Sequence, residues 1–262
     1  METKWVQRMV GLAMIATVAL SACSVESDTS GPDGVGDNRV KASGSGRVVE
    51  ESRKVSSFTG ISLYSDGQVT ITQGALEALT IETDDNLMEY LETTVIDGIL
   101  DIRVRESTDV DLDPTNGIKF DITVADLDGV ELHGAGTFDI GVLTTDRLEL
   151  TINGAGDFSI GNLEANEVEV VLAGSGSIVL AGQVGTERLE LLGAGDLDTS
   201  GMSAERVTVG LSGVGDVSVW ATDQLDVIVA GIGDVGYYGN PSVTQIVTGS
   251  GTVSHKGKQV VT

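Results

Sequence analysis

The chain has 262 residues, a length that accommodates one large domain or two small ones. Hydrophobic residues make up 40% of the sequence but aromatic residues only 4%, so the core must be built mainly from valine, isoleucine and leucine, which favour β-strands. The formal net charge of −25, with no basic stretch to offset it after residue 22, excludes nucleic acid as a partner because polyanion binding needs a positive surface.

Residues 1–22 have the form of a bacterial export signal. Lys4 and Arg8 precede an apolar run over residues 9–20 that is too short to span a membrane comfortably. The run ends in Leu-Ser-Ala-Cys at 20–23, which resembles the lipobox of bacterial lipoproteins, where the cysteine carries the lipid. We therefore expect Cys23 to be lipidated and to anchor the chain to a membrane; the alternative is an ordinary secretory signal. Cys23 is the only cysteine, so no disulfide can form within the chain.

The segment from the lipidated cysteine to Asn38 (23–38) is predicted to be a flexible tether, because it is polar, rich in Gly and Asp, and lacks apolar periodicity. By the sorting rule of the lipoproteins that it resembles, Ser24 carries no signal for retention in the inner membrane. The expected address is the outer membrane, with the domain facing either the periplasm or the outside.

Residues 39–127 are rich in predicted strands but not regularly repetitive. Alternating segments such as 68–72 and 100–104 predict strands, and the segment 86–91 predicts one short helical turn. We assign this part of the chain to the first coils and the N-terminal cap of a repetitive domain.

Residues 128–262 contain a repeat of 18 to 20 residues marked by Gly-x-Gly. A period in this range is typical of stacked coils, in which no coil can bury its apolar side alone. The paired glycines are predicted to form structural turns at Gly134, Gly136, Gly154, Gly156, Gly174, Gly176, Gly193, Gly195, Gly213, Gly215, Gly231 and Gly233, with a seventh pair at Gly249 and Gly251.

Two columns of aliphatic residues precede each Gly-x-Gly with the period of two that a strand requires. Together with a second short alternation after the glycines, they predict two strand segments per coil. The fold class is therefore all-β, a single-stranded parallel β-helix (β-solenoid) with about 18–20 residues per coil; an antiparallel sandwich is the alternative. The columns are Leu132, Ile152, Leu172, Leu191, Leu211, Val229 and Val247, and Val130, Leu150, Val170, Leu189, Val209 and Val227, the latter broken by Gln245.

Catalytic candidates are scarce, and no catalytic residue is predicted. The two histidines are His133 and His255, and His133 occupies a column where the other coils carry unrelated residues, which indicates a structural position. With Cys23 lipidated there is no free thiol for a Cys/His pair or a zinc site. The Gly-x-Gly elements are not followed by the helix that a nucleophile elbow or a phosphate loop needs.

One column of carboxylates is a candidate for metal binding. Asp157, Asp196, Asp216 and Asp234 directly follow Gly-x-Gly pairs and are expected to stack, with Ser177 interrupting the column. Such a row offers oxygen ligands for Ca²⁺, the one cofactor considered, although the calcium-binding nonapeptide repeat is missing. The alternative is that these aspartates accept hydrogen bonds from turn amides.

The repeated Gly-Ser/Ala-Gly-Asp-hydrophobic pattern, the segment Phe58-Thr59-Gly60-Ile61 and the segment Tyr238-Gly239-Asn240-Pro241 resemble the GIN-domain family. Members of this family are described as head domains of auto-transporter adhesins, and their function is not established. The resemblance covers roughly Val55 to Val253. It implies a right-handed β-helix behind a lipoprotein or secretion signal and brings no catalytic residues.

These features favour a non-enzymatic envelope lipoprotein whose β-helix displays a surface for adhesion, with a glycan or an envelope or surface protein as partner. The first alternative is a carbohydrate-active β-helix enzyme resembling polysaccharide lyases or glycosidases, for which Trp220, Tyr237 and Tyr238 are the nearest aromatic platform. The second alternative is a periplasmic structural or stress-related protein.

Overall fold

The computed structural model describes residues 40–105 and 110–259, which are almost entirely β-strand. The predicted export signal, the lipidation site Cys23 and the tether to residue 38 lie outside the described residues. Within the described ranges, no helix is long and apolar enough to cross a membrane.

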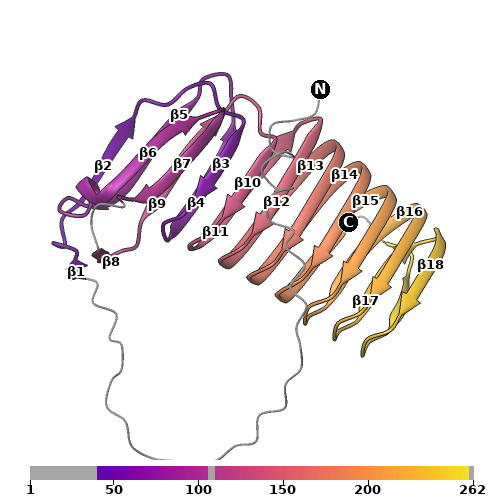
Figure 1. The fold of residues 1–262 in the computed structure, drawn as a ribbon. Helices are drawn as coiled ribbons and strands as arrows, with labels where there is room; N and C mark the ends of the chain where they lie inside the picture. The colour runs from indigo at the N-terminus through magenta and orange to yellow at the C-terminus, as the bar shows by residue number, and fades with distance from the viewer. Residues whose placement is uncertain (1–39, 106–109, 260–262) are drawn as a thin grey trace, which may run out of the picture. The chain divides into compact units, whose positions relative to one another are not determined.

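From residue 129 onward the chain winds into parallel coils stacked one on the next (Figure 1). Each residue lies beside the residue 18 to 20 positions further along, as Phe158 does beside Ile178. This parallel register confirms the predicted β-helix and rules out the antiparallel sandwich. The strands of this part are β10 (Gly129–Leu132), β11 (Ala135–Thr144), β12 (Arg147–Ile152), β13 (Ala155–Leu172), β14 (Ser175–Leu191), β15 (Ala194–Leu211), β16 (Val217–Val229), β17 (Val235–Gly239), β18 (Ser242–Val247) and β19 (Val253–Gly257).

The two predicted aliphatic columns point into the coils. Their members are buried from Val130 and Leu132 in β10 to Val227 and Val229 in β16, and only in β18 are Gln245 and Val247 exposed. A continuous apolar core extends through the coils from Phe58 to Val235, and the Phe138 and Phe158 rings stack within it with centroids 5.0 Å apart.

The N-terminal part closes one end of the solenoid with strands whose order in space differs from their order in the chain. Strand β3 pairs in parallel with β7 on one side and with β10 on the other, and β4 pairs likewise with β9 and β11. The coil β3–β4 therefore lies between an outer layer formed later in the chain and the regular coils. These strands are β3 (Gly60–Leu63), β4 (Gly67–Gln73), β7 (Ile99–Val104) and β9 (Lys119–Val124).

Antiparallel strands cover the outer layer. Strand β5 pairs with β2 and β9, and β6 pairs with β7, all antiparallel. The 3-10 turn η1 (Met88–Tyr90) lies in the segment where the sequence predicts a short helical turn. The remaining elements are β2 (Val48–Arg53), β5 (Ala78–Asp84), β6 (Leu91–Ile96) and a separate parallel pair, β1 (Val40–Ser43) with β8 (Val110–Asp113).

A buried carboxylate joins three segments of this cap. Asp84 is fully buried and accepts hydrogen bonds from the backbone N–H of Gly46 at 2.7 Å, from the backbone N–H of Thr115 at 2.8 Å, and from the Thr115 hydroxyl at 2.9 Å. These bonds, led by the Thr115 amide, hold the pKa of Asp84 below its usual value despite its burial. The ionised carboxylate thus replaces a chain-to-chain hydrogen-bond ladder where the strands end.

The Gly-x-Gly corners let adjacent coils approach more closely than side chains permit. A Cβ on Gly174 or on Gly176 would overlap the carbonyl oxygen of the glycine one coil earlier, Gly154 or Gly156. Gly176 also has a φ of +142°, which residues with a Cβ rarely adopt. Steric exclusion therefore explains why both corner positions are glycine in coil after coil.

One ionisable side chain lies inside the regular core. Glu187 occupies an inward column between Val168 and Val207 and has no exposed surface. Among the described residues, neither of its carboxylate oxygens has a hydrogen-bond partner, and the buried Thr199 hydroxyl donates to the Ser218 carbonyl at 3.3 Å. Burial raises the pKa of Glu187 to about 8, against a smaller opposing effect of Thr199. At neutral pH this side chain is therefore mostly a neutral carboxylic acid.

Replacing the corner glycine tests the steric account. We expect Gly176→Ala to lower the free energy of unfolding by about 3 kcal/mol, because it combines overlap with the neighbouring coil and a disfavoured φ. The matched control is Gly141→Ala in β11, where a Cβ would have no neighbour within 4 Å and φ is ordinary; this change should stay within about 0.5 kcal/mol of wild type. Urea denaturation at pH 7 measures both, and equal losses would refute the steric account.

The buried Glu187 makes a pH-dependent contribution to stability. Because its folded pKa lies above the unfolded value, the folded state holds the proton more tightly, and stability falls as pH rises from about 4.5 to about 8. Unfolding of the wild type and of Glu187→Gln should be followed by urea denaturation from pH 5 to pH 9.

The variant cannot ionise, so its stability relative to wild type should rise across this range by an amount on the order of 5 kcal/mol. Glu205→Gln, at an exposed position, is the control and should follow the wild-type curve. Parallel curves for Glu187→Gln and wild type would show that Glu187 is ionised throughout.

Candidate functional site

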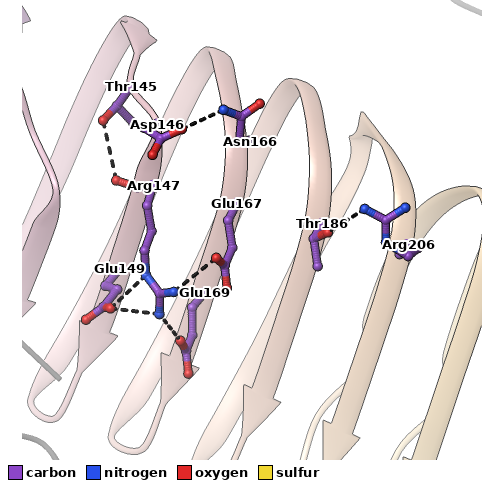
Figure 2. A network of polar contacts seen from close by, with 9 residues as sticks. All are labelled: Thr145, Asp146, Arg147, Glu149, Asn166, Glu167, Glu169, Thr186 and Arg206. Atoms are coloured by element: carbon purple, nitrogen blue, oxygen red, sulfur yellow. Dashed lines mark hydrogen bonds and ion pairs between the residues drawn. The ribbon is translucent and has the colours of Figure 1, made fainter. Parts of the chain in front are cut away.

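The polar side chains of the regular coils gather on the outer side of the strand segments that precede each Gly-x-Gly. We call this surface the returning face. It comprises the outward side chains of β12, of the second halves of β13 to β16, and of β18, whose inward neighbours form the aliphatic columns. Its first two coils carry a guanidinium surrounded by carboxylates (Figure 2).

Arg147 is the centre of this network. Its Nε and Nη2 atoms both lie 2.9 Å from Oε1 of Glu149, its Nη1 lies 3.0 Å from Oε2 of Glu167, and its Nη2 lies 2.8 Å from Oε2 of Glu169. One cation therefore serves three anions on two adjacent coils, β12 and β13 (Figure 2). A guanidinium that is already paired in this way is not available to bind an anionic ligand.

The electrostatics of the network follow from its partial burial. Desolvation disfavours the charge of Arg147, but the three glutamates outweigh it and the pKa of Arg147 is raised. The Glu149 side chain is only 7% exposed, and burial raises its pKa even though Arg147 opposes the shift. Glu149 therefore depends on Arg147 to remain ionised near neutral pH.

Around this centre, neighbouring coils are joined by further polar pairs. The Asn166 side-chain amide donates to Asp146 at 2.5 Å, and Arg206 donates to the Thr186 hydroxyl at 3.1 Å (Figure 2). These contacts link each residue to its counterpart about one coil away and do not converge on a common point. The network can fix the coils in register, and it presents a mainly anionic surface.

The predicted aspartate column forms, and its carboxylates are exposed. Asp157 accepts hydrogen bonds from the amide and hydroxyl of Ser177, Asp196 from the amide of Asp216, Asp216 from the amide of Asp234, and Asp234 from the amide and hydroxyl of Thr252. Each carboxylate thus accepts the amide at the same position of the next coil, rather than one of its own turn. Bonding to Thr252 holds the pKa of Asp234 below its usual value.

This ladder explains how like charges can stack, and it bears on the Ca²⁺ hypothesis. One oxygen of each aspartate is committed to a backbone amide at 2.7 to 3.0 Å. Among the described residues, no three His, Cys, Asp or Glu side chains are placed to hold a metal ion. The geometry therefore supports the hydrogen-bonding interpretation of the column.

His133 takes part in a stack that the sequence did not predict. Its ring lies parallel to that of Tyr64 with centroids 4.2 Å apart, the Arg103 guanidinium lies 4.6 Å from the Tyr64 centroid on β7, and His133 Nε2 is 3.2 Å from Glu131. Tyr64 follows β3 and Arg103 lies in β7, outside the regular repeat, so their neighbours could not be found by aligning coils.

The C-terminal aromatic residues cover the end of the core. Tyr237 packs against the core and stacks on His255 with centroids 5.0 Å apart, while His255 Nε2 lies 2.8 Å from the Gly239 carbonyl oxygen. Trp220 and Tyr238 hold paired positions on β16 and β17, and both are half-buried.

A parallel solenoid with an anionic, internally paired exterior defines a scaffold class of protein, in which coils present an extended surface. The family model described as "Putative auto-transporter adhesin, head GIN domain" matches residues 57–241, more than half of the chain. The protein belongs to this family, as its sequence features predict.

Solved structures agree with this assignment. The chain is similar to a putative adhesin from Bacteroides fragilis NCTC 9343, with 26% identity and a TM-score of 0.77, over 82% of this chain and 99% of that one. A putative lipid binding protein from Parabacteroides distasonis ATCC 8503 shares the fold at 23% identity and a TM-score of 0.63, with the same coverage of 82% and 99%. No curated protein matches the sequence.

The Arg147 network should contribute measurably to stability. We expect Arg147→Met to lower the free energy of unfolding at pH 7 by about 2–3 kcal/mol, because it leaves the buried Glu149 carboxylate without its partner. Arg206→Met is the control, since Arg206 is half exposed and pairs with the exposed Glu205, and its loss should cost less than about 0.5 kcal/mol.

Urea denaturation of both variants at pH 7 and at pH 4.5 makes the comparison. The cost of Arg147→Met should shrink at the lower pH, because Glu149 has a raised pKa and becomes protonated there. A cost that is the same at both pH values would show that the loss comes from packing of the arginine stem alone.

Proposed function

We propose that the protein is a non-enzymatic envelope lipoprotein whose solenoid displays a binding surface for adhesion, with a glycan or a surface protein as ligand. Membership of an adhesin-type family is the observation that carries the proposal. The relative from Bacteroides fragilis, which shares 26% identity and is described as a putative adhesin, supports the same role.

The form of the chain also supports this proposal. The polar groups of the returning face bond to one another across coils, so the face is a stiff, pre-organised surface on which a ligand would lose little conformational freedom. The export signal and Cys23, read from the sequence, favour attachment of the domain to the outer membrane through a lipid and a tether of about 15 residues.

Orientation on intact cells is the decisive measurement. Cells that express the chain with an epitope tag after Thr262 are treated with proteinase K, with and without disruption of the outer membrane, and attachment of the same cells to glycan and protein surfaces is scored. We expect the tag to be lost from intact cells while a periplasmic marker survives, and attachment to fall to background after the treatment.

The matched variant is Cys23→Ser, which should remove the lipid and release the domain from the membrane fraction without altering its fold. A tag that is protected until the outer membrane is breached would reject surface display and favour a periplasmic structural or stress-related role. Release of sugars or unsaturated products from a polysaccharide panel would reject the non-enzymatic assignment.

A further inference from the structure

The last coil ends in a strand with one open edge. Strand β18 pairs with β16, and the described residues supply no strand on its other side. The chain continues into β19, which pairs with β17 on the other face of the coil. It then returns toward β15, where the Gln259 side-chain amide donates to the Ser200 carbonyl at 2.8 Å. The yellow strand β18 therefore forms the end of the stack in Figure 1.

This end exposes the interior of the solenoid. All six side chains of β18 are exposed, including Val243 at 38% and Val247 at 41%. These two residues continue the inward columns that are buried in β16 at Leu225 and Val229. The outward Ile246 is 54% exposed as well. An additional strand beside β18 would bury aliphatic surface that every earlier coil buries against its neighbour.

The open edge also has unused backbone hydrogen-bonding capacity. The Thr248 amide donates to the Val229 carbonyl at 2.8 Å, on the β16 side. Because the direction of these groups alternates along a strand, the N–H and C=O groups of Val243, Gln245 and Val247 point to the open side. They form a template for one more strand.

Charge determines which strand fits there. Strand β18 carries no charged residue, and the segment 207–255 contains four aspartates, Asp216, Asp223, Asp226 and Asp234, but no lysine or arginine. A second copy of this chain, itself carrying a net charge of −25, would be repelled. An extended peptide with basic residues would be attracted.

We propose that the open edge of β18 is a docking site for an extended polypeptide segment with aliphatic side chains at alternate positions and basic residues at its ends. The segment adds as the next strand: its backbone bonds to the edge, its aliphatic side chains cover Val243 and Val247, and its basic ends face the acidic coils. This inference rests on the proposed binding function and adds to it a site and a partner chemistry.

The test uses the full chain purified in detergent and a fluorescent octapeptide, Lys-Val-Thr-Val-Thr-Val-Thr-Lys, followed by fluorescence anisotropy. In the variant Gln245→Pro, the proline removes an N–H that points to the open side and leaves the bonds to β16 in place. Gln245→Thr is the matched control. A second variant, Val247→Lys, places a positive charge on the exposed interior without changing the backbone.

Wild type and Gln245→Thr should bind the peptide alike, and both Gln245→Pro and Val247→Lys should bind it at least about tenfold more weakly. A peptide with glutamate in place of both lysines should also bind at least about tenfold more weakly at low salt. Unchanged circular dichroism and melting temperature would show that the variants are folded.

No binding to wild type, or equal binding to wild type and Gln245→Pro, would overturn the proposal. A dimer in sedimentation that disappears in Gln245→Pro would identify a second copy as the occupant and would overturn it as well. Cells that attach normally with Gln245→Pro would reject the β18 site while the proposed adhesion stands. Peptide binding by a domain that is protected inside cells would keep the site and reject surface display.

Discussion

Adjacent coils of this protein are separated by the spacing of hydrogen-bonded strands, about 4.8 Å, so each residue lies directly beside the residue at the same position of the next coil. This constraint acts on every column at once. Inward columns must be aliphatic to fill the core, and corner columns must be glycine because the carbonyl oxygen of Gly154 occupies the space that a Cβ on Gly174 would need. Columns of charge are the difficult case, because they bring like groups close together.

The structure handles stacked charge in two ways. In the aspartate column each carboxylate accepts the amide of the next coil, so negative charge is placed on a backbone donor instead of on another carboxylate. On the returning face, one arginine lies between three glutamates that would otherwise repel one another. A strongly acidic chain can thus form a tightly stacked solenoid, because its anions are held by donors that the stacking itself supplies.

The regular coils were predictable from the sequence, because equivalent residues recur at a nearly constant interval and the alternation before Gly174 or Gly193 directly reports the inward side. The same alternation, extended by one step from Leu189, reaches Glu187, so a signal for the buried acid was present. The outer layer formed by β7 and β9 could not be predicted, since its partners are distant in the chain and include antiparallel strands. The stacking of Tyr64 on His133 depends on that arrangement, and it was missed for the same reason.

The position of the coil β3–β4 has a consequence for how the protein is assembled and how it can change in length. This coil comes early in the chain, yet its neighbours on both sides, β7–β9 and β10–β11, are synthesised after it. On the ribosome it has no completed neighbour until those later strands emerge, whereas coils from β12 onward can each add to a finished template. Duplication or loss of a whole coil is therefore compatible with the fold among the regular coils, where a new copy repeats the register of its neighbours. Within the cap the same event would separate strands that must pair, so related solenoids should differ in length on the C-terminal side of β11.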